Sequence, residues 1–83
     1  MININYIESK QLCRISTDII DNNWKQVRFY YNQISDQSEI FEDSIELPWH
    51  VFISNSKVLS DVVSLYNLKV EFSPTAKVLF STS

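Results

Sequence analysis

The sequence predicts an α+β fold: a small single domain, residues 1–83, in which a short antiparallel sheet packs against two or three helices. Apolar side chains recur with a period of two around Ile4 and Val70, which is typical of strands with one buried face. They recur every three to four residues after Trp24 and after Val58, which is typical of amphipathic helices. Since 45% of the 83 residues are hydrophobic and 20% are charged, the chain has enough apolar surface for one core.

The first two strands are expected near the N-terminus. Ile2, Ile4 and Tyr6 alternate with asparagines, so one face of this strand is apolar and the other is polar. The short run 12–15 follows a polar step and is compatible with a second strand. Sequential strands usually pair, which predicts a hairpin, although no glycine marks its turn.

A first helix is expected next, with Thr17 as its N-cap and with Asp18 and Asp21 in its first turn, where the helix dipole favours acids. Five apolar residues follow at steps of four, three, four and three: Ile20, Trp24, Val27, Tyr31 and Ile34. The alternative is a strand over 25–31, because every second residue from Val27 is also apolar or aromatic and the preceding asparagine pair favours a turn. Of the two, we expect the helix.

Residues 35–46 are the acidic part of the chain, with five acids and no base, and we expect a surface loop. The acids are Asp36, Glu39, Glu42, Asp43 and Glu46. One interpretation is a solvated connection. The other is an anionic patch of Glu39, Glu42 and Asp43 that docks on a basic surface of a protein partner, with Phe41 as its apolar anchor.

A second helical region is expected to begin with Pro48, because the first helical position does not need an N–H donor. Its first apolar face is made of Trp49, Phe52 and Ile53. A restart at Asn55 or Ser56 leads into a longer stripe made of Val58, Leu59, Val62, Val63 and Tyr66. Asn67 is expected to end the helix in the left-handed conformation, since asparagine is the best substitute for glycine there.

The pattern of the C-terminal residues predicts a strand followed by a short helix. Apolar residues alternate with charged ones over 68–72, and Ser73-Pro74 is typical of an N-cap followed by proline at the first helical position. The helix has room for little more than two turns, and isolated helices of that length are marginal. We therefore expect a fragment of a longer protein, or a partner that supplies the packing, with Val78 and Phe80 partly exposed as a contact to that partner or to a second copy in a homodimer.

The composition argues against several kinds of chemistry. The chain has no glycine, so a phosphate-binding loop, a dinucleotide fingerprint or a nucleophile elbow cannot be built. Cys13 and His50 are the only residues of their kinds, which is too few for a zinc site or an internal disulfide. Cys13 is interpreted as a small buried hydrophobe rather than a reactive thiol. No catalytic, cofactor-binding or metal-binding residue is assigned, and neither enzyme activity nor a cofactor is expected.

Charge and hydropathy limit the expected partners. The net charge is −3 and the seven basic residues are scattered, so no direct contact with nucleic acid is expected. The aromatic residues fall on the predicted core stripes rather than in a basic groove for base stacking. No signal-peptide pattern and no long apolar stretch occurs, which predicts a cytoplasmic protein without a membrane partner.

Between Glu46 and Phe80 the string ELPWHVF is followed by an aliphatic helix and then by LYNLKVEFSPTAKVLF. This pattern resembles the end of the N-terminal extension of bacterial helicase-like ATPases of superfamily two, of the Swi/Snf kind. The matching positions are Leu47, Pro48, Trp49, Phe52, Phe72, Pro74, Ala76 and Lys77. The resemblance implies a non-catalytic accessory domain. It does not extend to ATP hydrolysis, since the family's phosphate-binding loop and metal-binding acids do not occur in this sequence.

The sequence therefore predicts a non-catalytic interaction or accessory domain, the N-terminal module of a helicase-like protein, whose partner is a protein or the rest of a larger chain. The alternative is a free-standing small acidic inhibitor, of the phage type, that binds a basic nucleic-acid-binding surface of a target protein. An enzyme would instead need a pocket on the order of a few hundred Å³ with convergent polar groups.

Overall fold

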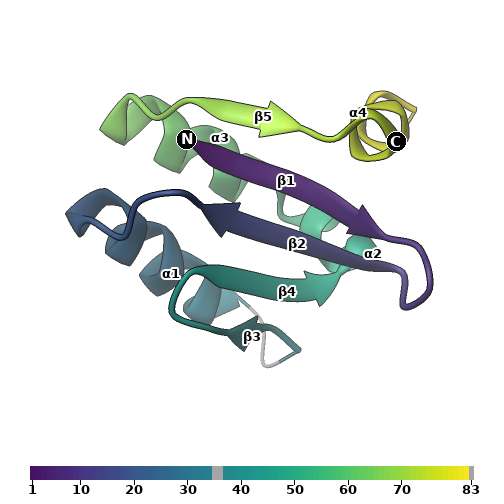
Figure 1. Ribbon diagram of the computed structural model, residues 1–83, viewed down its shortest axis with the longest axis horizontal. Coiled ribbons are helices and arrows are strands. Elements are labelled where there is room, and N and C mark those ends of the chain that lie inside the picture. The colour runs from purple at the N-terminus through teal and green to yellow at the C-terminus, as the bar shows by residue number, and fades with distance from the viewer. Residues whose placement is uncertain (35–36, 83) are drawn as a thin grey trace.

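The computed structural model describes residues 1–34 and 37–82, which form five strands and four helices. In chain order these are β1 (Ile2–Ile7), β2 (Leu12–Thr17), α1 (Asn22–Ile34), β3 (Glu39–Ile40), β4 (Ser44–Pro48), α2 (Trp49–Ser54), α3 (Ser56–Tyr66), β5 (Val70–Phe72) and α4 (Pro74–Ser81). The five strands make one sheet in the order β3-β4-β2-β1-β5 (Figure 1). The α+β class predicted from the sequence is confirmed.

The sheet is mixed. The β1–β2, β2–β4 and β3–β4 pairs are antiparallel, as expected, and Ile15 of β2 lies between Ile4 of β1 and Ile45 of β4. β5 instead pairs parallel with β1, because α2 and α3 carry the chain from β4 to the far edge of the sheet before β5 begins. The acidic segment, expected to be a loop, contributes β3 and the start of β4, since Ile40 and Ile45 pair across the two strands. Asp36 lies outside the described residues.

Helices α1, α2 and α3 lie on one side of the sheet, and α4 follows β5 at its edge (Figure 1). The core lies between the sheet and these helices. It contains Ile2 and Ile4 of the predicted alternating strands, whereas Tyr6, Val70 and Phe72 pack against it and are only partly buried. The buried hydrophobic residues are Ile2, Ile4, Cys13, Ile15, Trp24, Val27, Tyr31, Ile45, Leu47, Phe52, Leu59, Val62 and Ala76. Cys13 is therefore a core residue, as its apolar surroundings indicated.

Within residues 1–34 and 37–82, two residues adopt the left-handed conformation that glycine would otherwise supply. Gln11 has a φ of 53° at the end of the β1–β2 turn, and Asn67 has a φ of 52° at the C-terminus of α3. The left-handed region costs asparagine less than most residues, so the predicted Asn67 cap is confirmed. The hairpin turn at Gln11 shows how the first two strands are joined without glycine.

The first helix is confirmed and the alternative strand over 25–31 is wrong, but the helix begins later than Thr17. Thr17 belongs to β2, and its hydroxyl accepts a hydrogen bond from the Ile19 N–H at 3.2 Å. Asp21 caps the helix instead, because its Oδ1 accepts from the Trp24 N–H at 2.9 Å. Ile20 consequently lies outside the helix and is exposed.

The remaining helix starts follow local rules. Pro48 ends β4 and precedes α2 rather than opening it, whereas the restart at Ser56 is confirmed. Ser73 caps α4 as predicted, since its hydroxyl accepts from the Ala76 N–H at 3.3 Å and Pro74 is the first helical residue. The centroid of the Phe80 ring lies 5.0 Å from that of Phe72 and 6.1 Å from that of Phe52. These aromatic contacts pack α4 against β5 and α2.

We predict that Asp21→Ala lowers the free energy of unfolding by about 1 kcal/mol, because one N–H at the start of α1 loses its acceptor. Urea denaturation monitored by circular dichroism measures the change. Asp18→Ala is the matched control, since Asp18 is exposed and its only described hydrogen bond is long, at 3.4 Å to Asn3. An equal effect of the two substitutions would contradict the assignment of Asp21 as the cap.

Candidate functional site

The face of the sheet opposite the helices is polar. Because successive side chains of a strand point to opposite faces, the residues between the core positions all lie on this side. β1 contributes Asn5, β2 contributes Arg14 and Ser16, and β4 contributes Ser44 and Glu46. We call this surface the open face.

The β3–β4 turn, residues 41–44, borders the open face, and backbone hydrogen bonds hold it in place. The Phe41 N–H donates to the Ser44 carbonyl at 2.8 Å, which closes the turn. The Thr17 N–H donates to the Asp43 carbonyl at 3.1 Å, and the indole N–H of the buried Trp24 donates to the Glu42 carbonyl at 2.8 Å. These bonds attach the turn to β2 and to α1, so its side chains are presented from a fixed backbone.

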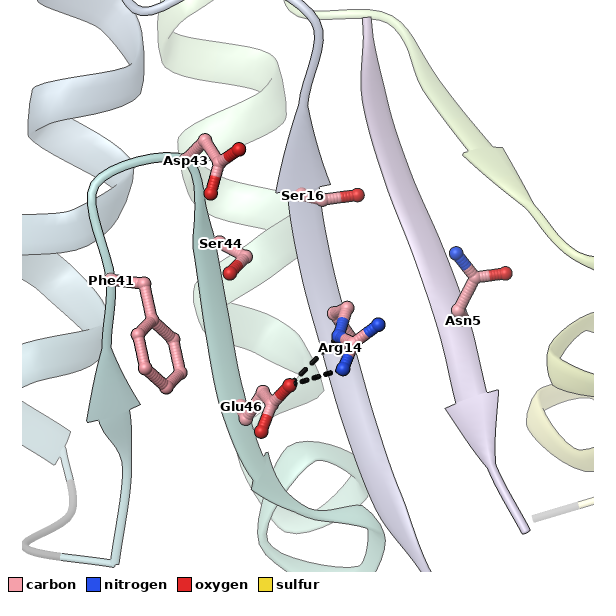
Figure 2. Close-up of a pocket in the computed structure, with 7 residues that line it drawn as sticks. All are labelled: Asn5, Arg14, Ser16, Phe41, Asp43, Ser44 and Glu46. Atoms are coloured by element: carbon pink, nitrogen blue, oxygen red, sulfur yellow. Dashed lines mark hydrogen bonds and ion pairs between the residues drawn. The ribbon is translucent and has the colours of Figure 1, made fainter.

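A concavity of about 480 Å³ lies on the open face beside this turn. It is lined by Asn5, Arg14, Ser16, Phe41, Asp43, Ser44 and Glu46. Figure 2 shows Phe41 on one side, Asn5 on the other, and the Arg14–Glu46 pair between them. The concavity is broad and open to solvent, and Phe41 is 44% exposed although it is a large apolar residue.

The charges at the site fall into two groups. Arg14 binds Glu46 twice, with Nε at 2.8 Å and Nη2 at 2.6 Å from Oε2, and the Glu46 side chain is only 16% exposed. This ion pair is neutral as a unit. The carboxylates of Glu39, Glu42 and Asp43 are exposed, and none of them makes an ion pair or a side-chain hydrogen bond with another described residue. The turn therefore carries negative charge that no ion pair with a described residue neutralises.

The structure brings four of the predicted partner-binding residues together and separates the other two. Glu39 lies on β3, and Phe41, Glu42 and Asp43 lie in the adjoining turn. We call these four residues the acidic hairpin. Val78 and Phe80 lie on α4, beyond the opposite edge of the sheet, with exposures of 62% and 37%. A contact between copies through Val78 and Phe80 stays a prediction.

Sequence reasoning missed the part of the site that β1 and β2 contribute. The alternation predicts Asn5 only on the polar face of the first strand and gives Arg14 and Ser16 no role, yet all three line the concavity with Glu46. The signal was present in the alternation itself, since a strand with one apolar face must expose the other. The alternation does not show which strands lie next to one another, so it could not predict that these residues meet.

Two ionisable groups among the described core residues have strongly displaced pKa values. Burial raises the pKa of the Cys13 thiol well above its usual range, and burial followed by the neighbouring Cys13 raises that of the Tyr31 phenol. Both groups stay neutral at physiological pH. Among the described residues no group of three potential metal ligands occurs, and none of their helices is both long and apolar enough to cross a membrane.

Comparison of the chain with known protein families, with curated proteins and with solved structures yields no match. The function is therefore inferred from the chain's own residues and their arrangement.

We predict that Cys13 of the folded protein resists a water-soluble disulfide reagent at pH 8 and reacts fully in urea, because a buried thiol of raised pKa is neither ionised nor accessible. Absorbance of the released thiolate measures the reaction. Rapid, complete modification in native buffer would show that the thiol is accessible, contrary to its position in the core.

Proposed function

We propose that this chain is a non-catalytic, cytoplasmic interaction domain that docks on a basic surface of a protein partner through the acidic hairpin. The observation that carries the proposal is the position of Phe41. It is a large exposed apolar residue in a turn of fixed backbone, and the adjoining carboxylates of Glu39, Glu42 and Asp43 make no ion pair with a described residue.

The two features of the acidic hairpin act at different stages of docking. Exposed carboxylates of one sign raise the rate at which a cationic surface is encountered. An aromatic side chain that enters a pocket on the partner then slows dissociation, because its apolar area leaves water. Since the turn is already fixed by hydrogen bonds to β2 and α1, little conformational entropy is lost when it docks.

The concavity on the open face supports docking better than catalysis. Its volume lies in the range of ligand pockets, but its most buried acid, Glu46, is paired with Arg14. Asp43 stands exposed at its rim, with no apolar enclosure that would separate its pKa from that of another acid. A partner side chain that carries a positive charge fits this concavity beside Phe41.

Two settings for this domain follow from the sequence. In the first, it is the N-terminal accessory module of a helicase-like protein, which the resemblance between Glu46 and Phe80 favours. Leu47, Phe52 and Ala76, which match that family, are fully buried here, so a structural role accounts for them as well. In the second, it is a free-standing acidic inhibitor that covers a nucleic-acid-binding surface, which the acidic hairpin favours. The coding sequence downstream of Ser83 separates them, because only the first requires ATPase motifs there.

We predict that a photo-reactive phenylalanine analogue at position 41 cross-links a basic partner in extract of the source cells, whereas the same analogue at position 65 does not. Position 65 is the control because Leu65 is also an exposed large apolar residue but lies on α3, which leads into β5 at the edge of the sheet opposite the acidic hairpin. Mass spectrometry identifies the cross-linked protein. Equal cross-linking from both positions would indicate non-specific apolar contact and would contradict the proposed surface.

Once the partner is purified, we predict that Glu39→Ser/Glu42→Ser/Asp43→Ser slows association by about tenfold at low salt, because electrostatic steering is lost. Stopped-flow kinetics measures the rate. Glu8→Ser/Asp18→Ser/Asp61→Ser is the control with the same change in net charge, made at exposed acids outside the acidic hairpin. Binding that is insensitive to salt, or equally slowed in both variants, would count against the acidic hairpin as the docking surface.

A further inference from the structure

β5 is an edge strand whose outer side is free in the described chain (Figure 1). The Ile2 N–H donates to the Lys69 carbonyl at 2.8 Å, and the Ser73 N–H donates to the Ile4 carbonyl at 2.9 Å. In a parallel ladder of this register the groups of Glu71 also point toward β1. The N–H and C=O groups of Val70 and Phe72 therefore point outward from the edge of the sheet, away from β1, where another strand can pair with them.

The sequence of this edge is complementary to itself when two copies meet antiparallel. If Val70 lies opposite Val70 of the second copy, the two residues exchange a pair of N–H···O=C bonds. Phe72 then lies opposite Leu68 of the second copy, and its N–H reaches that residue's carbonyl. The Leu68 N–H is not needed, because it already donates to Val63 at 3.0 Å. Val70, Phe72 and Leu68 are all only partly buried in the single chain. Pairing them across two copies therefore removes apolar surface from water.

Charge selects this register. Lys69 and Glu71 are both exposed, and with Val70 at the centre Lys69 of each copy lies opposite Glu71 of the other, which makes two reciprocal ion pairs. Centring the pair on Glu71 instead places two like carboxylates against each other. The other edge of the sheet lacks this complementarity, because β3 has only two residues and adjoins the acidic hairpin, so two copies would repel there.

We propose that a second copy of this chain pairs antiparallel with β5 around Val70, so that one sheet continues through both copies. This surface is distinct from the acidic hairpin, which lies at the opposite edge and remains free in the dimer. Because β5 is only three residues long, the contact is small and the dimer dissociates readily.

The test combines sedimentation velocity with amide hydrogen exchange, both from about 10 µM to about 1 mM protein. The weight-average mass is expected to rise toward the dimer with concentration. Exchange at the Val70 amide is expected to slow in parallel, since this N–H is bonded only in the dimer. The Glu71 amide is the internal control, because it faces β1 and is protected at every concentration.

Charge exchange then tests the register. Lys69→Glu and Glu71→Lys each create like charges at two positions, and each is expected to raise the dissociation constant about tenfold. The double variant Lys69→Glu/Glu71→Lys restores opposite charges and is expected to return the constant to within about threefold of the original. Lys57→Glu, at an exposed site on α3, controls for the change in net charge.

A wild type that stays monomeric, with Val70 exchange independent of concentration, would overturn the proposal and leave the β5 edge to another protein's strand. Association that the two single variants affect no more than Lys57→Glu would overturn it as well, because a different surface, such as Val78 and Phe80, would then join the copies. Neither result bears on the acidic hairpin, which none of these substitutions changes.

Discussion

The structure depends on one constraint: the packed helices cover a single face of the sheet. Because strand side chains alternate between faces, this constraint assigns every strand residue either to the core or to the open face. Ile4, Ile15 and Ile45 stand side by side in the core across three strands. The residues between them, such as Arg14 and Glu46, are left on the open face, where they become available for binding.

Trp24 connects the core with the candidate docking surface. Its ring is buried beneath the sheet, its backbone N–H is capped by Asp21, and its indole N–H holds the carbonyl of Glu42. The start of α1, the core and the acidic hairpin therefore share one residue. This arrangement explains how an exposed turn without glycine or proline keeps a defined conformation, since the backbone of the turn is bonded to elements that the core fixes.

The two edges of the sheet differ in chemistry, and this difference separates their proposed roles. At the β3 edge, exposed carboxylates that make no ion pair with a described residue favour a cationic partner and disfavour a second copy. At the β5 edge, Lys69 and Glu71 alternate in sign around Val70, so the edge is neutral and matches itself in the antiparallel direction. A small domain of this topology can thus present two surfaces without either one interfering with the other.

The sequence by itself determined the fold class, the spans of most helices and strands, the caps at Asn67 and Ser73, and the grouping of acids around Phe41. These features depend on neighbours within about one turn or one hairpin, and local periodicity and side-chain chemistry record them. Only the tertiary structure decided the strand order, the parallel direction of β5, the cap at Asp21 in place of Thr17, and the meeting of Arg14 with Glu46, which lie 32 residues apart. Those outcomes depend on which apolar faces pack together across the chain, and no short window of sequence contains that information.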